Sequence, residues 1–342
     1  MNIEAVDLFC GIGGLTAGLI KSGITVKAGY DIESACRFGY EYNNKAIFVE
    51  KDVAQVTAEE INHWYSKDVV RLLAGCAPCQ PFSTYNQGKD TTTDKKWPLL
   101  YHFSRLIEEV KPELVTMENV PDVTKHKVYH DFVEKLESLG YVVSASKVDC
   151  IQYGIPQTRK RHVLLASLIS EEINLIPPTH DKPVTVRDII FGLPVLDAGK
   201  QDKVDPLHVC SRLSEINTKR MLASRPGGTW KDWPKELIAK CHLRESGKSY
   251  GGVYARMEWD KPAPTMTTQC FGFGNGRFGH PSQDRAISLR EAALFQTFDS
   301  DYKFVENDVL IKSVGKMIGN AVPVRLGEVV GKSFKKAEYN LF

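Results

Sequence analysis

Short apolar runs alternate with polar or glycine-rich turns through the first half of the chain. Seven of them have the length of a strand, at residues 5–9, 24–30, 47–49, 69–74, 114–117, 142–145 and 163–166. The stretch 15–22, between the first two runs, has the length of a short helix. Strands that alternate with helices are typical of a parallel sheet covered by helices. We therefore predict an α/β fold with a doubly wound, mostly parallel sheet.

The composition is that of a globular protein and gives no sign of a membrane protein or a secreted one. The chain has 342 residues, 42% of them hydrophobic, which is enough to build a core in two domains. No run approaches 18 consecutive apolar residues, and the N-terminus enters a strand directly, so we expect no membrane span and no signal peptide. Eight scattered cysteines are typical of a reduced, cytoplasmic protein.

Positive charge is concentrated in one segment. The net charge is only +2, but residues 202–285 hold 14 Lys and Arg against nine Asp and Glu. This excess permits nucleic-acid binding there, although surface charges also serve solubility alone.

Cys79 lies between two prolines, directly after the apolar run 69–74. Pro78 and Pro81 end the strand and stiffen the turn, which places Cys79 at the sheet edge where open α/β folds bind ligands. A thiolate there is a candidate nucleophile. Two alternatives stay open: a small buried side chain, or a redox or zinc pair with Cys76. The prolines disfavour the helix of a redox pair, and no second close ligand pair follows for zinc.

A glycine-rich turn at 10–14 joins the first run to the first predicted helix. Asp31 lies 20 residues after Gly11, close to the spacing of a nucleotide-binding βαβ unit. Its carboxylate suits ribose hydroxyls, and the glycines let a ligand approach the backbone. Asp52 follows the third run in the same way, or it is an ordinary helix cap or loop acid.

Two further motifs carry charge where strands end or begin. Glu118 follows the run 114–117, where a buried carboxyl group can donate a proton; a surface turn acid is the alternative. Arg159 and Arg161 precede another run. Their spacing puts both on one side of an extended chain, so both can face one anionic or carbonyl group. A solvated basic face is the alternative.

Six motifs follow one another in a characteristic order. They are Asp7–Gly14, Pro78–Ser83, Glu118–Val120, Gln157–Arg161, Arg290–Gln296 and Gly319–Pro323. In this order the chain resembles, nearly from end to end, the DNA (cytosine-5)-methyltransferases of prokaryotic or phage type.

The resemblance implies a Rossmann-like methyltransferase domain at 1–176 plus 283–342, with a smaller target-recognition domain at 177–282. Nine glycines between 227 and 279 suit a loop-rich domain. The last helix, holding 319–323, is expected to pack beside the first strand and complete the cofactor pocket. The implied cofactor is S-adenosylmethionine, with S-adenosylhomocysteine as product and no metal. The implied partner is double-stranded DNA, bound by a monomer; whether a separate restriction endonuclease accompanies it stays open.

The resemblance also implies a mechanism. Cys79 adds to carbon 6 of a cytosine that is flipped out of the duplex, so that carbon 5 can take the methyl group. Glu118 holds the cytosine at N3, and Arg159 holds it at O2. Arg161 supports the catalytic loop. Asn119 belongs to the same motif as Glu118. The residues implied to bind the cofactor are Phe9, Gly11, Ile12, Gly13, Asp31, Ile32, Asp52, Val53, Pro78, Leu99, Asn320 and Ala321.

Two glycine-rich stretches, 245–256 and 269–277, are predicted to bind DNA. We expect Arg256 and Gln269 to read bases and Lys248 and Arg277 to contact phosphates, with structural turns as the alternative. Three other residues complete the predicted DNA contacts: Ser83, Thr265, and Tyr85, which either fills the hole left by the flipped base or is a surface aromatic.

The chain departs from the family pattern at one motif, and other functions stay open as alternatives. Many family members carry Asp-x-Arg-Gly-x-Leu after the catalytic loop, where this chain has Lys96 and Trp97, so loop closure can differ. The same chemistry on tRNA is one alternative, which the recognition segment disfavours. A catalytically silent DNA-binding protein is disfavoured by the intact set of Cys79, Glu118 and Arg159. A nicotinamide dehydrogenase could use the Gly11–Asp31 unit, but it would leave Cys79 and the arginines unexplained.

Overall fold

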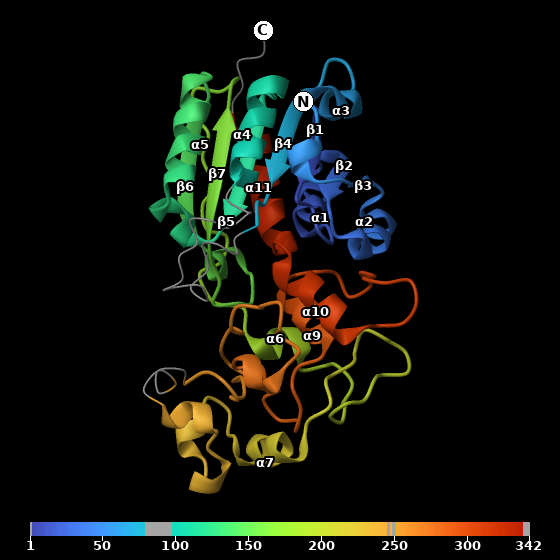
Figure 1. Cartoon of the computed structure of the whole chain (residues 1–342), viewed down its shortest axis with the longest axis vertical. Coiled ribbons are helices and arrows are strands. Elements are labelled where there is room, and N and C mark those ends of the chain that lie inside the picture. Colours follow the sequence, from blue (N-terminus) through green and yellow to red (C-terminus); the bar gives the residue numbers. More distant parts are fainter. Residues whose placement is uncertain (1, 79–97, 245–246, 248–250, 338–342) are drawn as a thin grey trace. The chain divides into compact units, whose positions relative to one another are not determined.

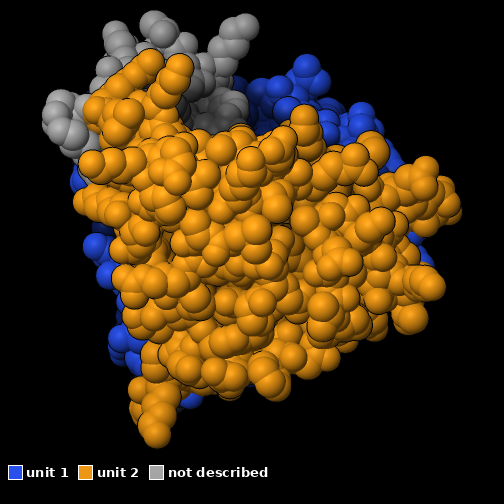
Figure 2. Space-filling view, turned by 90° about the horizontal axis from the view of Figure 1, so that it is seen from below, with its two compact units in different colours: residues 1–153, 160–179, 322–342 blue, residues 154–159, 180–321 orange. Residues whose placement is uncertain are grey.

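The computed structural model describes residues 2–78, 98–244, 247 and 251–337, which form two compact units. Unit 1 comprises Met1–Tyr153, Lys160–Thr179 and Val322–Phe342, and unit 2 comprises Gly154–Arg159 and His180–Ala321 (Figure 2). These bounds differ from the domains expected from the sequence, because 154–159 and 283–321 pack within unit 2.

Unit 1 is built on a seven-stranded sheet with the order β3-β2-β1-β4-β5-β7-β6 (Figure 1). The first five strands in this order are parallel to one another, and β7 runs antiparallel to both β5 and β6. The mostly parallel α/β fold is therefore confirmed. The strands are β1 (Ile3–Leu8), β2 (Thr25–Asp31), β3 (Ile47–Glu50), β4 (Val70–Gly75), β5 (Leu114–Asn119), β6 (Val142–Asp149) and β7 (Lys160–Ser167).

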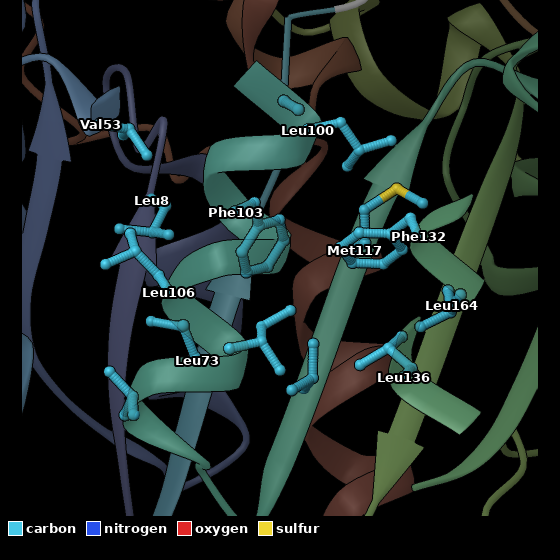
Figure 3. Packing of buried hydrophobic residues seen from close by; sticks show 14 of the residues in the cluster. Leu8, Val53, Leu73, Leu100, Phe103, Leu106, Met117, Phe132, Leu136 and Leu164 are labelled. Carbon is cyan, nitrogen blue, oxygen red and sulfur yellow. The ribbon is translucent and has the colours of Figure 1, made fainter. Parts of the chain in front are cut away.

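Helices cover both faces of this sheet. On one face, α4 and α5 bury Phe103, Leu106 and Phe132 against strand residues such as Leu73 and Met117 (Figure 3). The helices of unit 1 are α1 (Gly14–Lys21), α2 (Arg37–Asn44), α3 (Ala58–Trp64), α4 (Pro98–Val110), α5 (Lys127–Ser138) and α11 (Val324–Lys336). No helix in the described part of the chain has the length and apolar composition needed to cross a membrane.

The last helix, α11, packs on α1 rather than beside the first strand. The two helices touch through glycines: a Cβ at Gly18 would lie 2.2 Å from the Val324 carbonyl oxygen, and one at Gly327 would lie 2.8 Å from that of Leu15. The motif Gly319–Pro323 is not within α11 either. It ends α10 (Ile311–Asn320) and leads into α11, so the expectation for this motif is corrected on both points.

Unit 2 consists of short helices and loops held by buried polar groups. Its helices include α6 (Val186–Ile190), α7 (Glu215–Ala223), α9 (Leu289–Phe295) and α10. Arg285 and Glu291 are fully buried and form a two-pronged ion pair at 2.7 and 2.8 Å. Burial also lowers the pKa of the adjacent His280 to about 4, so this histidine is neutral at pH 7. A paired, hydrogen-bonded cluster of this kind can be buried without large penalty.

Candidate functional site

The ends of two neighbouring strands carry the central residues of the site. In unit 1, β4 and β5 lie side by side and parallel, so Gly75 and Glu118 reach the same edge of the sheet. Because open α/β sheets bind ligands at this edge, the position is the expected one for a reactive group.

The Glu118 carboxylate is held on both of its oxygens. Oε2 accepts a hydrogen bond from the Cys76 thiol at 2.8 Å, and Oε1 forms an ion pair with Nε of Arg161 at 2.9 Å. The Glu118 side chain is nearly buried, at 6% exposure, and that of Arg161 is 13% exposed. The antiparallel pairing of β5 with β7 brings this arginine to the carboxylate. The arrangement fixes the direction in which Glu118 presents its acid group.

Asn119 bonds the segment that follows β4. It is 1% exposed, its Nδ2 donates to the Ala77 carbonyl at 3.2 Å, and its Oδ1 accepts from the Val120 N–H at 2.8 Å. The end of β4 is thereby tied to the end of β5. Four predicted site residues lie outside the described residues: Cys79, Ser83, Tyr85 and Lys248.

Arg159 and Arg161 have different partners. Arg159 is 3% exposed and belongs to unit 2, where Nη1 donates to the Met266 carbonyl at 3.1 Å and Nη2 to that of Ala321 at 3.4 Å. Arg161 belongs to β7 in unit 1 and pairs with Glu118. Spacing alone suggested one shared role, but the contacts support two.

The glycine turn and Asp31 are joined by a hydrogen bond. The carboxylate accepts the Gly11 N–H on Oδ2 and the Glu33 N–H on Oδ1, both at 2.9 Å. Gly11 has a φ of 51°, and apart from its chain neighbours no described residue has an atom within 4 Å of the place where its Cβ would be. Gly13, with a φ of 91°, precedes α1. Open space beside a fixed carboxylate fits a ligand with hydroxyl groups.

The other predicted cofactor residues have varied surroundings. Ile32 is 71% exposed, so its apolar side chain is available to a flat ring. Asp52 is exposed and caps η2 (Val53–Gln55), with Oδ1 accepting the Ala54 N–H at 2.9 Å. The remaining unit 1 residues of this set are the buried Ile12 and Val53 and the partly buried Phe9, Pro78 and Leu99. In unit 2, Asn320 is exposed and Ala321 is buried.

Asp7, which lies in the first sequence motif, is buried just ahead of the glycine turn. Its Oδ2 accepts a hydrogen bond from Thr16 Oγ1 at 2.7 Å. Burial is the main cause that raises the pKa of Asp7 to about 7, while the Thr16 hydrogen bond acts against that rise.

The contact of Cys76 with Glu118 is not predicted from the sequence, which suggests only a pair with Cys79. The signal for it is that Cys76 closely follows one apolar run and Glu118 directly follows the next.

Arg256 has a structural role in unit 2. It is 5% exposed, and all five of its N–H groups have acceptors: four backbone carbonyls and the Asp284 carboxylate. The carbonyls belong to Met221, Ser224, His280 and Gln283. This arrangement directs no donor toward a base edge, so the contacts do not support the base-reading role expected of Arg256.

We expect Arg256→Ala to lower the free energy of unfolding by at least about 2 kcal/mol, since each buried acceptor left unsatisfied costs about 1–3 kcal/mol. Chemical denaturation measures this change. Arg225→Ala is the matched control, because that arginine is 73% exposed and makes only a surface ion pair. Unchanged stability together with a relaxed base preference would restore Arg256 as a reader.

The other described DNA-contact candidates differ in exposure. Gln269 is exposed, whereas Arg277 is half-buried and donates through Nη1 to the carbonyls of Gly228 and Arg256. Thr265 Oγ1 donates to the Thr158 carbonyl at 3.0 Å, which ties this segment to the motif that contains Arg159. Of these three, Gln269 is the side chain best placed to meet a ligand.

Comparison with known proteins adds independent information. Residues 3–336 match the family model described as C-5 cytosine-specific DNA methylase. The type II methylase M.HgiDII of Herpetosiphon aurantiacus is 53% identical over 97% of this chain and 94% of its own length. The type II methyltransferase M.Eco47II of Escherichia coli is 31% identical over 97% of this chain and 79% of its own length.

Solved structures with low sequence identity share the fold. A putative DNA modification methyltransferase encoded within an Escherichia coli prophage has a TM-score of 0.74 at 23% identity, covering 98% of this chain and 99% of its own. The Entamoeba histolytica methyltransferase EhMeth has a TM-score of 0.67 at 16% identity, covering 97% of this chain and 98% of its own.

Proposed function

The chain belongs to the C-5 cytosine-specific DNA methylase family and is a DNA (cytosine-5)-methyltransferase, and we propose that it acts by covalent catalysis on a cytosine flipped out of a specific duplex sequence. One observation carries the proposal within unit 1. Glu118, held by Cys76 and Arg161, lies near the end of β5, beside β4, whose last residue, Gly75, precedes Cys79 by four positions in the sequence. A nucleophile and an acid group at one sheet edge are what this reaction requires.

The reaction begins when the Cys79 thiolate forms a bond to carbon 6 of cytosine. Electrons of the C5–C6 double bond move toward N3, which takes a proton or a hydrogen bond from Glu118. Carbon 5 then takes the methyl group while the methyl–sulfur bond of the donor breaks, which leaves S-adenosylhomocysteine. A base removes the C5 proton, the C6–sulfur bond breaks and restores the thiolate, and N3 returns its proton to Glu118. Fixed groups aimed at the charge that develops on N3 and O2 lower the barrier by several kcal/mol.

Arg161 is the arginine we now assign to the carbonyl side of the cytosine. It lies beside Glu118 in unit 1, so one base can contact both side chains. Arg159 donates to two backbone carbonyls of unit 2, which supports a positioning role in place of the O2 contact first expected. Asn119 keeps the Ala77 carbonyl, two residues before Cys79 in the sequence, in place.

S-adenosylmethionine, on which the family depends, supplies an electrophilic methyl group when bound. The residues present fit it: Asp31 has fixed oxygens that can accept from ribose hydroxyls, and the exposed Ile32 offers an apolar contact for adenine. The second oxygen of Asp52 can accept from the adenine amino group, since Oδ1 already caps η2. Phe9, Gly11, Gly13 and Val53 would form the wall on which the ligand lies, with Asn320 and Ala321 as further cofactor residues.

Double-stranded DNA is the proposed substrate, with residues 177–282 of the chain as the recognition segment. The relatives named above are type II methylases, so we propose that this enzyme protects DNA from a separate restriction endonuclease that recognises the same sequence. Gln269 is the described residue we propose as a base reader, since a glutamine can form two hydrogen bonds with adenine.

Bisulfite sequencing of DNA from a methylation-deficient host that expresses the chain tests this function. We expect one cytosine within one short sequence to resist conversion throughout the genome. A host that expresses Cys79→Ala is the control and should show complete conversion. If tRNA cytosines resist conversion while all DNA cytosines are converted, DNA is not the substrate. If the cytosines of both DNA and tRNA are converted, the chain does not methylate cytosine.

A further inference from the structure

Two buried glutamines face each other in unit 2, 139 residues apart in the sequence. Gln157 and Gln296 are both fully buried, and Nε2 of Gln157 donates to Oε1 of Gln296 at 2.7 Å. The same Nε2 also donates to the Phe295 carbonyl at 2.6 Å. The catalytic chemistry proposed above uses neither side chain, so their burial needs another explanation.

Each glutamine is also bonded to a segment with a proposed role. Oε1 of Gln157 accepts the Met266 N–H at 2.8 Å, in the segment 265–269 that includes the candidate reader. Nε2 of Gln296 donates to the carbonyls of Ile318 at 2.6 Å and Ala321 at 3.0 Å, beside the candidate cofactor residue Asn320. The pair therefore connects the reading segment with the end of α10.

Arg159 closes these contacts into a ring. Its guanidinium donates to the carbonyl of Met266, whose N–H is bound by Gln157, and to the carbonyl of Ala321, which Gln296 also binds. Displacing a member of this ring leaves a buried donor or acceptor without its partner, which costs free energy.

Close backbone packing gives the same two segments a second connection. A Cβ at Gly319 would lie 2.2 Å from the carbonyl carbon of Thr267 and from the nitrogen of Thr268. A Cβ at Gly315 would lie 2.2 Å from the Phe271 ring. Residues 267–271 thus lie directly on α10, and a shift of one must move the other.

We propose that Gln157 and Gln296 are positioning residues that couple recognition of the target sequence by 265–269 to cofactor affinity at Asn320 and Ala321. The inference rests on the function proposed above. When the correct bases fix the reading segment, the ring fixes the end of α10 in the arrangement that binds the cofactor. Linkage makes the effect reciprocal, and couplings of this type typically change affinity by about 5- to 150-fold.

Calorimetric titration of the full chain with S-adenosylhomocysteine measures this coupling. Affinity is measured with no DNA, with a duplex that contains the sequence found by bisulfite sequencing, and with a duplex of random sequence. We expect the recognised duplex to raise the affinity of the wild type at least about fivefold over the random duplex. In Gln296→Met and in Gln157→Met, the affinity with the recognised duplex divided by the affinity with the random duplex should fall to near one. The double variant should lose nothing further, since either change opens the same ring.

Thr185→Ala is the stability control. Thr185 caps α6 in unit 2 through a capping box with Asp188 and has no contact with the ring, so its loss should lower the melting temperature and leave the affinity ratio intact. Folded glutamine variants that keep the wild-type ratio overturn the proposal, as does a wild type whose affinity does not depend on the duplex sequence. If Thr185→Ala also loses the difference in cofactor affinity between the recognised and the random duplex, that difference depends on stability alone. This result would overturn the proposal too. Absence of protected cytosines in the bisulfite experiment is the separate sign that the proposed function itself has failed.

Discussion

Replacing Cys79 with alanine is expected to abolish methyl transfer while DNA and cofactor still bind. Without the Cys79 thiolate no bond forms to carbon 6, and carbon 5 of cytosine stays a poor nucleophile. Incorporation of labelled methyl groups into duplex DNA measures the loss, and titration measures the retained binding. A duplex with 5-fluorocytosine at the target should trap the wild type as a covalent adduct, because fluorine cannot leave as a proton does.

Cys76→Ala is the matched control for that result. The Cys76 thiol donates to Glu118 in the structure, so its loss should slow the reaction and still permit the fluorocytosine adduct. Adduct formation that requires Cys76 and survives in Cys79→Ala would reverse the assignment of the nucleophile.

Glu118→Gln is expected to lower kcat by about 10²- to 10⁴-fold, the usual contribution of a positioned acid or base. The amide keeps the size of the side chain and can still accept from Cys76, but it can neither protonate N3 nor pair with the Arg161 charge. Single-turnover kinetics with saturating DNA and cofactor separate this effect from weaker binding.

The control for this prediction is Glu113→Gln, just before the opposite end of β5. Glu113 pairs with Arg71 at 2.8 Å and has an exposure of 26%, so the change alters an ion pair and leaves the proposed reaction untouched. An unchanged kcat in Glu118→Gln, or an equal loss in Glu113→Gln, would contradict the role of Glu118 as the acid group.

Much of the sheet was predictable because each buried strand is a compact apolar run. All seven predicted runs coincide with strands. The central strands β1, β4 and β5 are buried almost throughout, and apolar side chains on both faces leave a continuous signal. The direction of β7 was not predictable from its run, Val163–Ala166, because the same apolar residues suit either direction. Its antiparallel pairing with β6 follows from the connection, which contains no crossover helix.

The site was predictable where a motif occupies a strand end, and less so where partners come from distant parts of the chain. Asp31 follows its strand at the expected spacing from Gly11, and the two are hydrogen-bonded. Arg256 looked like an exposed arginine in a glycine-rich stretch, but its partners are backbone carbonyls, which no side-chain pattern encodes. The contact between Gln157 and Gln296 likewise depends on a tertiary arrangement that neither motif contains.

The division of the chain has a consequence for exchanging sequence specificity among relatives. Because Gly154–Arg159 and residues 283–321 pack with 180–282, a chimera that transplants only 177–282 would cut through the bonds of Met266 to Gln157 and Arg159. A transplant that carries both 154–159 and 180–321 keeps those bonds within one donor protein. Its junctions fall at 153/154, 159/160, 179/180 and 321/322, so a graft of specificity in this enzyme is a two-segment graft.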